Sequence, residues 1–415
     1  MTLFLTMVNF LEGRPSLDLL STDRVARAAS LAFALPDAVP TMLQYNGFIG
    51  DAGFLKNLAT FLSKAYNDKV EVNNLCCSPG ASLMIEHILT ILTRPQSTTK
   101  YAFFQNPTYH FGFKIFQDAG FSKNQFVGVP DDANGLNVDF LESSLKEKFG
   151  SGSDTTNDYY DAVLYCVPTH GNPSSSILSE ERREKLVKLA KQYNVLIICD
   201  DVYDLLTYQG IAPKRVVAYD LESNSKPVVI SNCSFSKILA PGMRVGWVEA
   251  HETLVKRLGL CGSFISGSNP ANFSSIIVSQ MLNSDDPQVN LQTNIDHLKV
   301  VLHERLVEGL WKPYQEFLEP LGCYASLPTG GYFMWMRLPP GINVTLLDEI
   351  IIERNIDVRL GSGNLFATPG PQPTDEFSNY LRLCFAHYPK EKLREGMKTV
   401  EGVIRLAQER KENSL

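Results

Sequence analysis

The stretch SEERREKLVKLAKQYNVLIICDD, residues 179–201, decides the predicted fold. Its first part has a serine followed by two glutamates, which is typical of a helix start, and it places Leu186, Leu189 and Ala190 on one helical face. Its second part, VLIICDD, is a continuous apolar run that ends in two carboxylates, as expected for a strand buried on both faces. A helix that leads directly into such a strand indicates a parallel sheet covered by helices.

The same alternation of strand-like and helix-like segments extends from about Cys76 to Ile230. Apolar runs such as YAFFQ, DAVLYCV and PVVIS are separated by segments with helical periodicity. We therefore predict an α/β fold with three layers and a mostly parallel central sheet, in which ligand sites gather at the carboxyl ends of the strands. From about Asn290 the pattern changes to a long helical stretch and then short strands, which predicts a smaller α+β domain. The predicted units are an N-terminal arm that joins the small domain (1–40), a large domain (41–290) and a C-terminal small domain (291–415).

Composition excludes several classes of function. The 415 residues include 45 acidic and 38 basic side chains, a net charge of −7, without a basic run, so we expect no nucleic-acid partner. No segment resembles a membrane span. The eight cysteines lie mostly in apolar runs without a Cys-x-x-Cys pair, which argues against a metal site and a disulfide framework. The start MTLFLTMVNFLEGRPS has neither a basic n-region nor a cleavage site, so we expect a cytoplasmic protein.

The segment SNCSFSKILAPGMRVGW, residues 231–247, is the first candidate site. A lysine that forms an imine must be neutral part of the time, and partial burial or a neighbouring cation such as Arg244 would lower the pKa of Lys237. Arg244 can also bind a phosphate, together with the hydroxyls of Ser234 and Ser236. A lysine nucleophile beside a phosphate site is what a pyridoxal-phosphate enzyme requires. The alternative is a surface lysine in a polar turn.

Carboxylates and amides follow two further apolar runs. Asp200 and Asp201 end the strand VLIICDD, where a protonated pyridine nitrogen would be a suitable cation, although the pair can also cap a helix. Tyr203, just beyond them, and Asn172, in LYCVPTHGNPSS, can each hydrogen-bond a phenolic oxygen. An ordinary Gly-Asn-Pro turn is the alternative for Asn172, and we assign His170 to that turn.

Weaker signals come from loops and helix starts. NNLCCSPGASLMIEHIL runs from a strand into a helix at Gly80, Ala81 and Ser82, and a helix N-terminus can bind a phosphate. Tyr109, in YAFFQNPTYHFG, can stack on a flat cofactor or pack in the core. Tyr45, in MLQYNGFIGDAG, by itself indicates only a turn.

Arg382 lies within the apolar strand NYLRLCFA. A buried arginine is unstable without an anion, so either a protein carboxylate or a substrate carboxylate must approach it.

In this order, the motifs resemble the class I/II group of fold-type I pyridoxal-phosphate-dependent aminotransferases. SFSKILAPGMRVGW is similar to the lysine signature of that family, and the resemblance spans about Asn9 to Ala386. It implies that pyridoxal 5'-phosphate forms a Schiff base with Lys237, which then moves a proton between substrate and cofactor, with a pyridoxamine form between the half-reactions. It also implies that Asp200 pairs with the pyridine nitrogen, and Tyr203 and Asn172 with the phenolic oxygen.

The remaining contacts are also carried over from the resemblance. The implied phosphate contacts are Ser234, Ser236, Arg244, Gly80, Ala81 and Ser82, and Tyr109 is implied to stack on the ring. Arg382 is implied to bind the α-carboxylate of the substrate, beside Asn172. Tyr45 is implied to reach the phosphate of the neighbouring subunit, which would make the protein a homodimer with shared active sites. Ser174-Ser175 replaces the frequent Thr-Gly after Asn-Pro, without loss of a cofactor contact.

The form SFSK…APG…R…GW and the start FLEGRPS look more like the 2-aminoadipate and aromatic (kynurenine-type) aminotransferases than the aspartate branch. This implies transfer of an amino group from such an L-amino acid to a 2-oxo acid such as 2-oxoglutarate, with Tyr109 and Tyr332 as pocket walls. Arg14 can then reach a distal carboxylate, or it can lie exposed in a flexible arm.

Three alternative functions remain. A carbon–sulfur β-lyase or a ring-forming synthase would need the same lysine. A ligand-sensing domain of a transcriptional regulator is disfavoured because the resemblance begins near residue 9 and the net charge is negative. A nicotinamide dehydrogenase is disfavoured because no Gly-x-Gly-x-x-Gly follows a strand.

Overall fold

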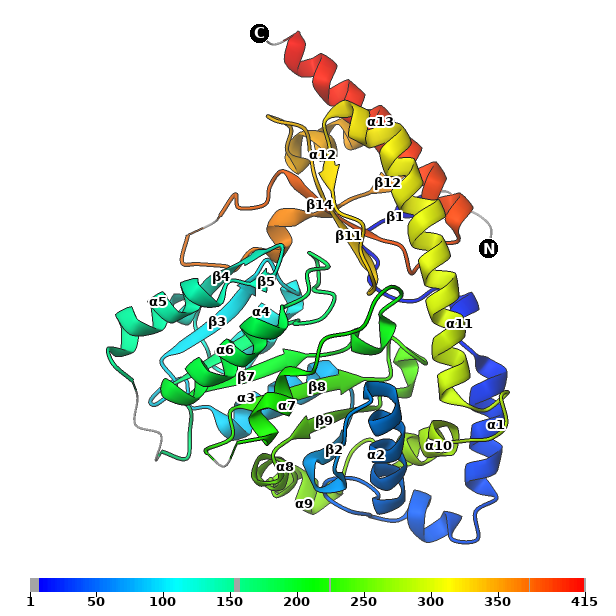
Figure 1. Cartoon of the computed structure of the whole chain (residues 1–415). Coiled ribbons are helices and arrows are strands. Elements are labelled where there is room, and N and C mark those ends of the chain that lie inside the picture. Colours follow the sequence, from blue (N-terminus) through cyan, green and yellow to red (C-terminus); the bar gives the residue numbers. More distant parts are fainter. Residues whose placement is uncertain (1–6, 153–156, 224, 373, 414–415) are drawn as a thin grey trace.

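The computed structural model of the chain describes residues 7–152, 157–223, 225–372 and 374–413. The structure has a large part built on a mixed sheet and a smaller part built on an antiparallel sheet (Figure 1). This arrangement confirms the predicted α/β fold with a smaller α+β part.

The large sheet has eight strands in the order β2-β9-β8-β7-β6-β3-β4-β5. Its strands are β2 (Leu75–Ser78), β3 (Tyr101–Asn106), β4 (Phe126–Asp132), β5 (Gly135–Leu136), β6 (Ala162–Cys166), β7 (Val195–Asp200), β8 (Val229–Ser234) and β9 (Gly246–Ala250). The pairs from β8 through β7, β6 and β3 to β4 are parallel, whereas β2, β9 and β5 pair antiparallel. The sheet is therefore mostly parallel, as predicted, and its parallel strands all end on one side.

Helices pack beside the large sheet (Figure 1). They are α1 (Thr22–Phe33), α2 (Ala52–Tyr66), α3 (Ala81–Leu92), α4 (His110–Asp118), α5 (Val138–Phe149), α6 (Glu180–Gln192), α7 (Val216–Leu221), α8 (Glu252–Gly259), α9 (Gly262–Gly267) and α10 (Asn272–Leu282). The start and the buried face of α6 are as predicted, because Ser179 caps the helix and Leu186, Leu189 and Ala190 are buried. It leads into β7, in which every residue is buried.

The smaller part contains the sheet β10-β11-β14-β13. Its elements are α11 (Leu291–Glu304), β10 (Tyr324–Ala325), β11 (Phe333–Arg337), α12 (Val344–Glu353), β12 (Val358–Arg359), β13 (Gly361–Ser362), β14 (Tyr380–Cys384) and α13 (Lys390–Glu412). The N-terminal segment reaches this part, because β1 (Val8–Asn9) pairs in parallel with β12. Other helical turns are Leu17–Leu19, Val39–Leu43, Val72–Asn74, Lys123–Gln125, Asp204–Leu206, Pro241–Met243, Arg305–Trp311, Tyr314–Leu318, Glu319–Leu321 and Gly363–Phe366.

The eight cysteines are all buried and unpaired. Burial raises the pKa of the Cys77 thiol to about 12, so this thiol fills space in the core as a neutral group. Within the ranges described, none of the helices combines the length and the apolar character needed to span a bilayer.

Candidate active site

A cavity of about 430 Å³ lies where the parallel strands of the large sheet end. Asp200 is the last residue of β7, Ser234 is the last residue of β8, and Phe333 and Arg382 reach the same cavity from β11 and β14. The site residues predicted from the sequence that line this cavity are Lys237, Asp200, Tyr203, Ala81, Ser82, Tyr109, Asn172, Ser234, Ser236, Arg244 and Arg382. Segments distant in sequence therefore converge on one site.

Lys237 follows β8 and points its amine at the N-terminal arm. Its Nζ donates a hydrogen bond to the Gly13 carbonyl at 2.8 Å and lies 5.9 and 5.4 Å from the ring centroids of Tyr203 and Tyr332. Burial of the amine lowers the pKa of Lys237 to about 8, and Arg382 acts in the same direction. The cation that assists is thus Arg382, whereas the sequence suggested Arg244. The lowered pKa favours the neutral amine that a lysine nucleophile requires.

Asp200 lines the cavity and, within the described chain, has one side-chain oxygen without a hydrogen-bond partner. Tyr165 donates its hydroxyl to Oδ2 of Asp200 at 2.6 Å, while the buried Oδ1 has no hydrogen-bond partner among the described residues. Burial raises the pKa of Asp200 to about 6. A buried carboxylate oxygen without a partner fits a protonated ring nitrogen. Asp201 instead accepts a hydrogen bond from Ser231 at 2.5 Å and does not line the cavity.

Another part of the cavity wall carries groups that suit an anion. Gly80 is the N-cap of α3 and has a φ of +94°, and a Cβ there would come within 2.6 Å of Arg244 Nη2. Arg244 donates to the Pro79 carbonyl at 3.1 Å and to the Ser236 hydroxyl at 3.4 Å, and Ser234 donates to Ser236 at 2.9 Å. Backbone N–H groups of a helix start, a guanidinium and two hydroxyls form a donor set that suits a phosphate. Gly80 does not line the cavity, but its lack of a Cβ lets the Arg244 guanidinium approach the start of α3.

Two tyrosines predicted for the ring of the cofactor lie in the cavity wall. Tyr203 is buried, and its ring centroid lies 5.5 Å from that of Tyr332 and 6.0 Å from that of Phe333. Burial raises the pKa of Tyr109, and the carboxylate of Asp200 raises it further, so the Tyr109 hydroxyl stays neutral. Both side chains can therefore offer a flat face and a neutral hydroxyl to a bound ring.

Arg382 is 3% exposed and is held by neutral oxygens. Its Nη1 donates to Oδ1 of Asn172 at 2.8 Å and its Nη2 to the Leu11 carbonyl at 2.7 Å, with the rings of Phe333 and Phe366 centred 4.2 and 4.6 Å away. Its Nε has no partner, and no carboxylate in the described part of the chain forms an ion pair with it. Of the two anions considered from the sequence, this setting favours the substrate carboxylate.

Several residues considered from the sequence do not line the cavity: besides Gly80 and Tyr332, they are Arg14, Tyr45 and His170. Arg14 forms an ion pair with Glu12 at 3.0 Å, and its side chain is 64% exposed. Tyr45 is 75% exposed. His170 is buried, has a φ of +54° and contacts the Thr207 hydroxyl at 2.9 Å, in agreement with its assignment to a turn.

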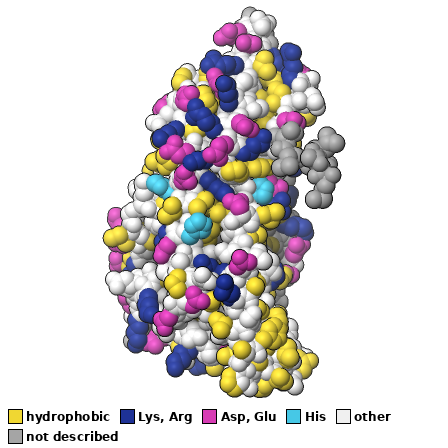
Figure 2. Space-filling view, turned by 90° about the vertical axis from the view of Figure 1, so that its right-hand side faces the viewer, with side chains coloured by type: hydrophobic (Ala, Val, Ile, Leu, Met, Phe, Trp, Pro, Cys, Tyr) yellow, Lys and Arg dark blue, Asp and Glu magenta, His cyan; other side chains and the backbone are white. Residues whose placement is uncertain are grey.

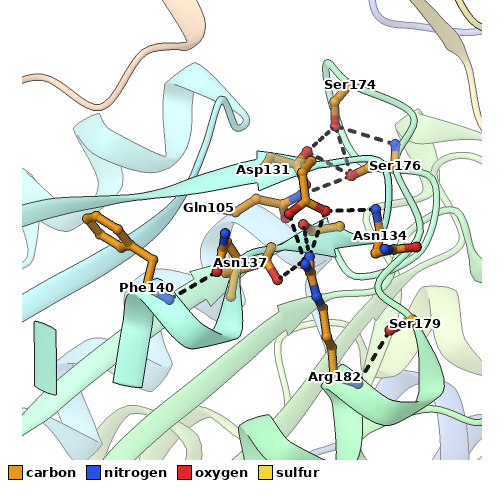
Figure 3. A network of polar contacts seen from close by, with 12 residues as sticks. Gln105, Asp131, Asn134, Asn137, Phe140, Ser174, Ser176, Ser179 and Arg182 are labelled. Carbon is orange, nitrogen blue, oxygen red and sulfur yellow. Dashed lines mark hydrogen bonds and ion pairs between the residues drawn. The ribbon is translucent and has the colours of Figure 1, made fainter. Parts of the chain in front are cut away.

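A partly buried polar network around Asp131 was not found from the sequence (Figure 3). Ser174, Ser176 and Gln105 donate to Oδ2 of Asp131 at 2.6, 2.8 and 3.1 Å. The two serines belong to the loop that carries Asn172, so Asp131 anchors this loop to the end of β4. The residues meet across β3, β4 and the loop after β6, and no local spacing in the sequence signals such a contact.

Other contacts missed from the sequence involve Tyr165, the carbonyls of Leu11 and Gly13, and Arg359 in the cavity wall. Tyr165 lies in an apolar run, where a core role is the default interpretation. The backbone carbonyls carry no signal in a sequence at all.

The cavity suits a cofactor that carries three groups: an aldehyde, a basic ring nitrogen and a phosphate. Residues 6–400 match the model of the family "Aminotransferase class I and II", so the chain belongs to that family. The protein is a pyridoxal-phosphate-dependent transaminase. Its residues fit this cofactor. The free Oδ1 of Asp200 suits the ring nitrogen, and the lowered pKa of Lys237 suits an amine that reacts with the aldehyde. The close approach of Arg244 to Gly80 suits the phosphate.

The chain is similar to several named relatives over most of its length. It is 28% identical to aromatic-amino-acid aminotransferase 1 of Thermococcus litoralis over 88% of this chain and 80% of the relative. It is 24% identical to the 2-aminoadipate transaminase of Thermus thermophilus over 94% of this chain and 88% of the relative. The crystal structure of the multiple substrate aminotransferase from Thermococcus profundus is similar with a TM-score of 0.82 at 25% identity, covering 98% of this chain and 93% of that one.

Proposed function

We propose that the protein transfers the amino group of an L-amino acid with a long or aromatic side chain to a 2-oxo acid such as 2-oxoglutarate. The proposed donors are 2-aminoadipate, aromatic amino acids and kynurenine-like compounds. The observation that carries this proposal is that Lys237, Asp200 and Arg382 meet in one cavity. The names of the relatives from Thermococcus litoralis and Thermus thermophilus support the donor class.

When bound, pyridoxal phosphate supplies an electron-withdrawing ring that stabilises negative charge at the Cα of the substrate. Asp200 would keep the ring nitrogen protonated through its free Oδ1, while Tyr165 fixes the carboxylate from the other oxygen. Tyr203 and Asn172 would hydrogen-bond the phenolic oxygen. Arg244, Ser234, Ser236, Gly80, Ala81 and Ser82 would hold the phosphate, and Tyr109 would cover one face of the ring.

Lys237 would attach the cofactor and act as the base. Its amine has a pKa of about 8 in the protein without ligands, so it can take the proton from the Cα of the substrate and return it on the other side of the reaction. The aromatic rings of Tyr203 and Tyr332 border this amine, with centroids 5.9 and 5.4 Å from Nζ.

Arg382 positions the substrate. The Asn172 amide and the Leu11 carbonyl hold its two terminal nitrogens, which leaves the guanidinium fixed in direction without neutralising its charge. A substrate α-carboxylate then gains a charge-assisted hydrogen bond in a buried setting.

The same account includes a homodimer, with Tyr45 completing the site of the partner subunit. Tyr45 and its neighbours Val39 and Leu43 are 75%, 68% and 63% exposed, which is unusual for apolar side chains of a monomer. Figure 2 shows many apolar side chains gathered at the lower end of the molecule, where the segment after α1 lies in Figure 1. Sedimentation of the purified protein distinguishes a dimer from a monomer.

Two further expectations belong to the proposal. The division into residues 1–40, 41–290 and 291–415 is supported by the pairing of β1 with β12, which ties the arm to the smaller part. A cytoplasmic location is supported by the eight buried, unpaired cysteines, because free thiols are typical of reducing compartments.

The proposal is tested with the purified holoenzyme and single amino acids in the absence of an acceptor. We expect aromatic donors and 2-aminoadipate to convert the visible absorption of the bound cofactor, and 2-oxoglutarate to restore it. Absence of any spectral change with every amino acid would contradict transamination. Release of pyruvate from cysteine conjugates at a higher rate than amino transfer would favour a β-lyase instead.

A further inference from the structure

We propose that Arg359 binds the side-chain carboxylate of dicarboxylic substrates. This inference rests on the proposed function and names the residue that selects such substrates. Arg359 ends the short strand β12, has an exposed side chain and lines the same cavity as Lys237 and Arg382.

The backbone ties Arg359 to the substrate site through the N-terminal arm. Asn9 pairs with Arg359, and the Phe10 N–H donates to the Arg359 carbonyl at 3.0 Å. One residue further, the Leu11 carbonyl accepts from the Arg382 guanidinium at 2.7 Å. Three consecutive arm residues therefore lie between the two arginines and fix their spacing.

The two guanidinium groups have different surroundings. Arg382 is buried, whereas Arg359 stands at the solvent-exposed edge of the cavity. In the described part of the chain, no hydrogen bond or ion pair engages the side chain of Arg359, although its charge acts on the exposed carboxylate of Asp348. A substrate with carboxylates at both ends can thus place one on the buried arginine and the other on the exposed one.

The remaining charges in the cavity wall leave this role to Arg359. Glu12 also lines the cavity, but its Oε2 is paired with Arg14 at 3.0 Å and its Oε1 accepts from the Asn9 amide at 3.4 Å. The charge of Arg14 is thus used to neutralise Glu12. Burial lowers the pKa of His110 to about 4, so that side chain adds no positive charge at neutral pH. The geometry therefore favours Arg359 as the partner of the distal carboxylate, in place of Arg14, which the sequence suggested.

The test compares Arg359→Gln with wild type in the donor half-reaction. The holoenzyme is mixed with 2-aminoadipate or phenylalanine alone, because a 2-oxoglutarate acceptor would itself present a second carboxylate. We expect the apparent second-order rate constant for 2-aminoadipate to fall roughly tenfold or more, as for loss of a hydrogen bond to a charged group. The loss with phenylalanine should be much smaller, and Arg359→Lys should restore part of the 2-aminoadipate rate.

Arg354→Gln is the matched control. Arg354 is exposed, lies five residues earlier in the chain and does not line the cavity, so its replacement should change neither rate. Equal losses for both donors in Arg359→Gln would overturn the assignment, and so would a wild type that converts phenylalanine but no dicarboxylic amino acid. A wild type that converts no amino acid would contradict the proposed function itself, which separates the two failures.

Discussion

The Arg382 guanidinium lies 2.8 Å from the side-chain oxygen of Asn172, so the proposed carboxylate-binding residue is aligned by a residue also proposed to contact the cofactor. The contact joins β14 of the smaller part to the loop after β6 of the large part. The relative position of the two parts therefore controls the direction of the guanidinium.

The first prediction concerns this contact. Asn172→Asp places a carboxylate beside Arg382 in a buried setting, where the resulting ion pair competes with the substrate carboxylate. We expect KM to rise roughly tenfold or more for every amino acid, independent of the side chain. Steady-state kinetics with one aromatic and one dicarboxylic donor measures this effect, and an unchanged KM for both would show that Arg382 does not bind the α-carboxylate.

A second prediction follows from the lowered pKa of Lys237. Because burial lowers this pKa to about 8, the neutral amine becomes abundant as the pH rises through 8, well before ordinary lysines lose their protons. In the apoprotein, the rate of acylation at Lys237 should rise with a midpoint near pH 8, as measured by competitive labelling and mass spectrometry. Arg382→Gln should move this midpoint upward, since Arg382 contributes to lowering the pKa. A midpoint above 10 in the wild type would contradict the assigned environment.

The third prediction separates two adjacent carboxylates. Asp200→Ala should lower kcat about 10²–10³-fold, because removing a group that stabilises charge in a transition state costs this much. Asp201→Ala removes the acceptor of the Ser231 hydroxyl and should mainly lower the melting temperature. Near-normal turnover in Asp200→Ala, together with an inactive but folded Asp201→Ala, would show that the assignment is wrong by one residue.

The fourth prediction concerns the Asp131 network. Asp131→Ala removes the acceptor of the buried Gln105 amide and of the partly buried Ser174 and Ser176 hydroxyls, and should lower the free energy of unfolding by about 1–3 kcal/mol. Urea unfolding measures this loss. Asp131→Asn retains a carbonyl oxygen that can accept from Ser174 and Ser176, and should be less destabilising than alanine.

The pH dependence of Asp131→Asn is a separate test. Burial raises the pKa of Asp131 to about 6 in the folded protein, above its value in the unfolded chain. The contribution of this group to the free energy of unfolding is therefore present at low pH and declines as the pH rises from about 4 to 6. Relative to wild type, the asparagine variant should gain stability across this range. A difference that does not change with pH would contradict the raised pKa.

The sequence predicted the parts of the site that follow buried strands. The apolar runs before Asp200 and Lys237 identify β7 and β8, and parallel strands end at one edge of a sheet, so the two side chains had to lie near each other. Arg382 was equally visible, as a charge within an apolar strand.

The rest of the site depends on contacts between distant segments. Arg14 was the arginine suggested by its place in the arm, but the arm turns its side chain toward Glu12 and solvent. Arg359 gave no signal, because it is an exposed charge on a strand of two residues that forms only against β1. Asp131 was missed because its partners come from β3 and from the loop after β6.

The most direct test of the account is to identify the lysine that carries the cofactor. The purified holoenzyme is reduced with borohydride and digested, and the modified peptide is sequenced by mass spectrometry. We predict a single modified lysine, Lys237, and no modified peptide from a Lys237→Ala variant that keeps its fold by circular dichroism and has lost nearly all amino transfer. A reduced adduct on any other lysine of the wild type, or full activity in Lys237→Ala, would contradict the central claim.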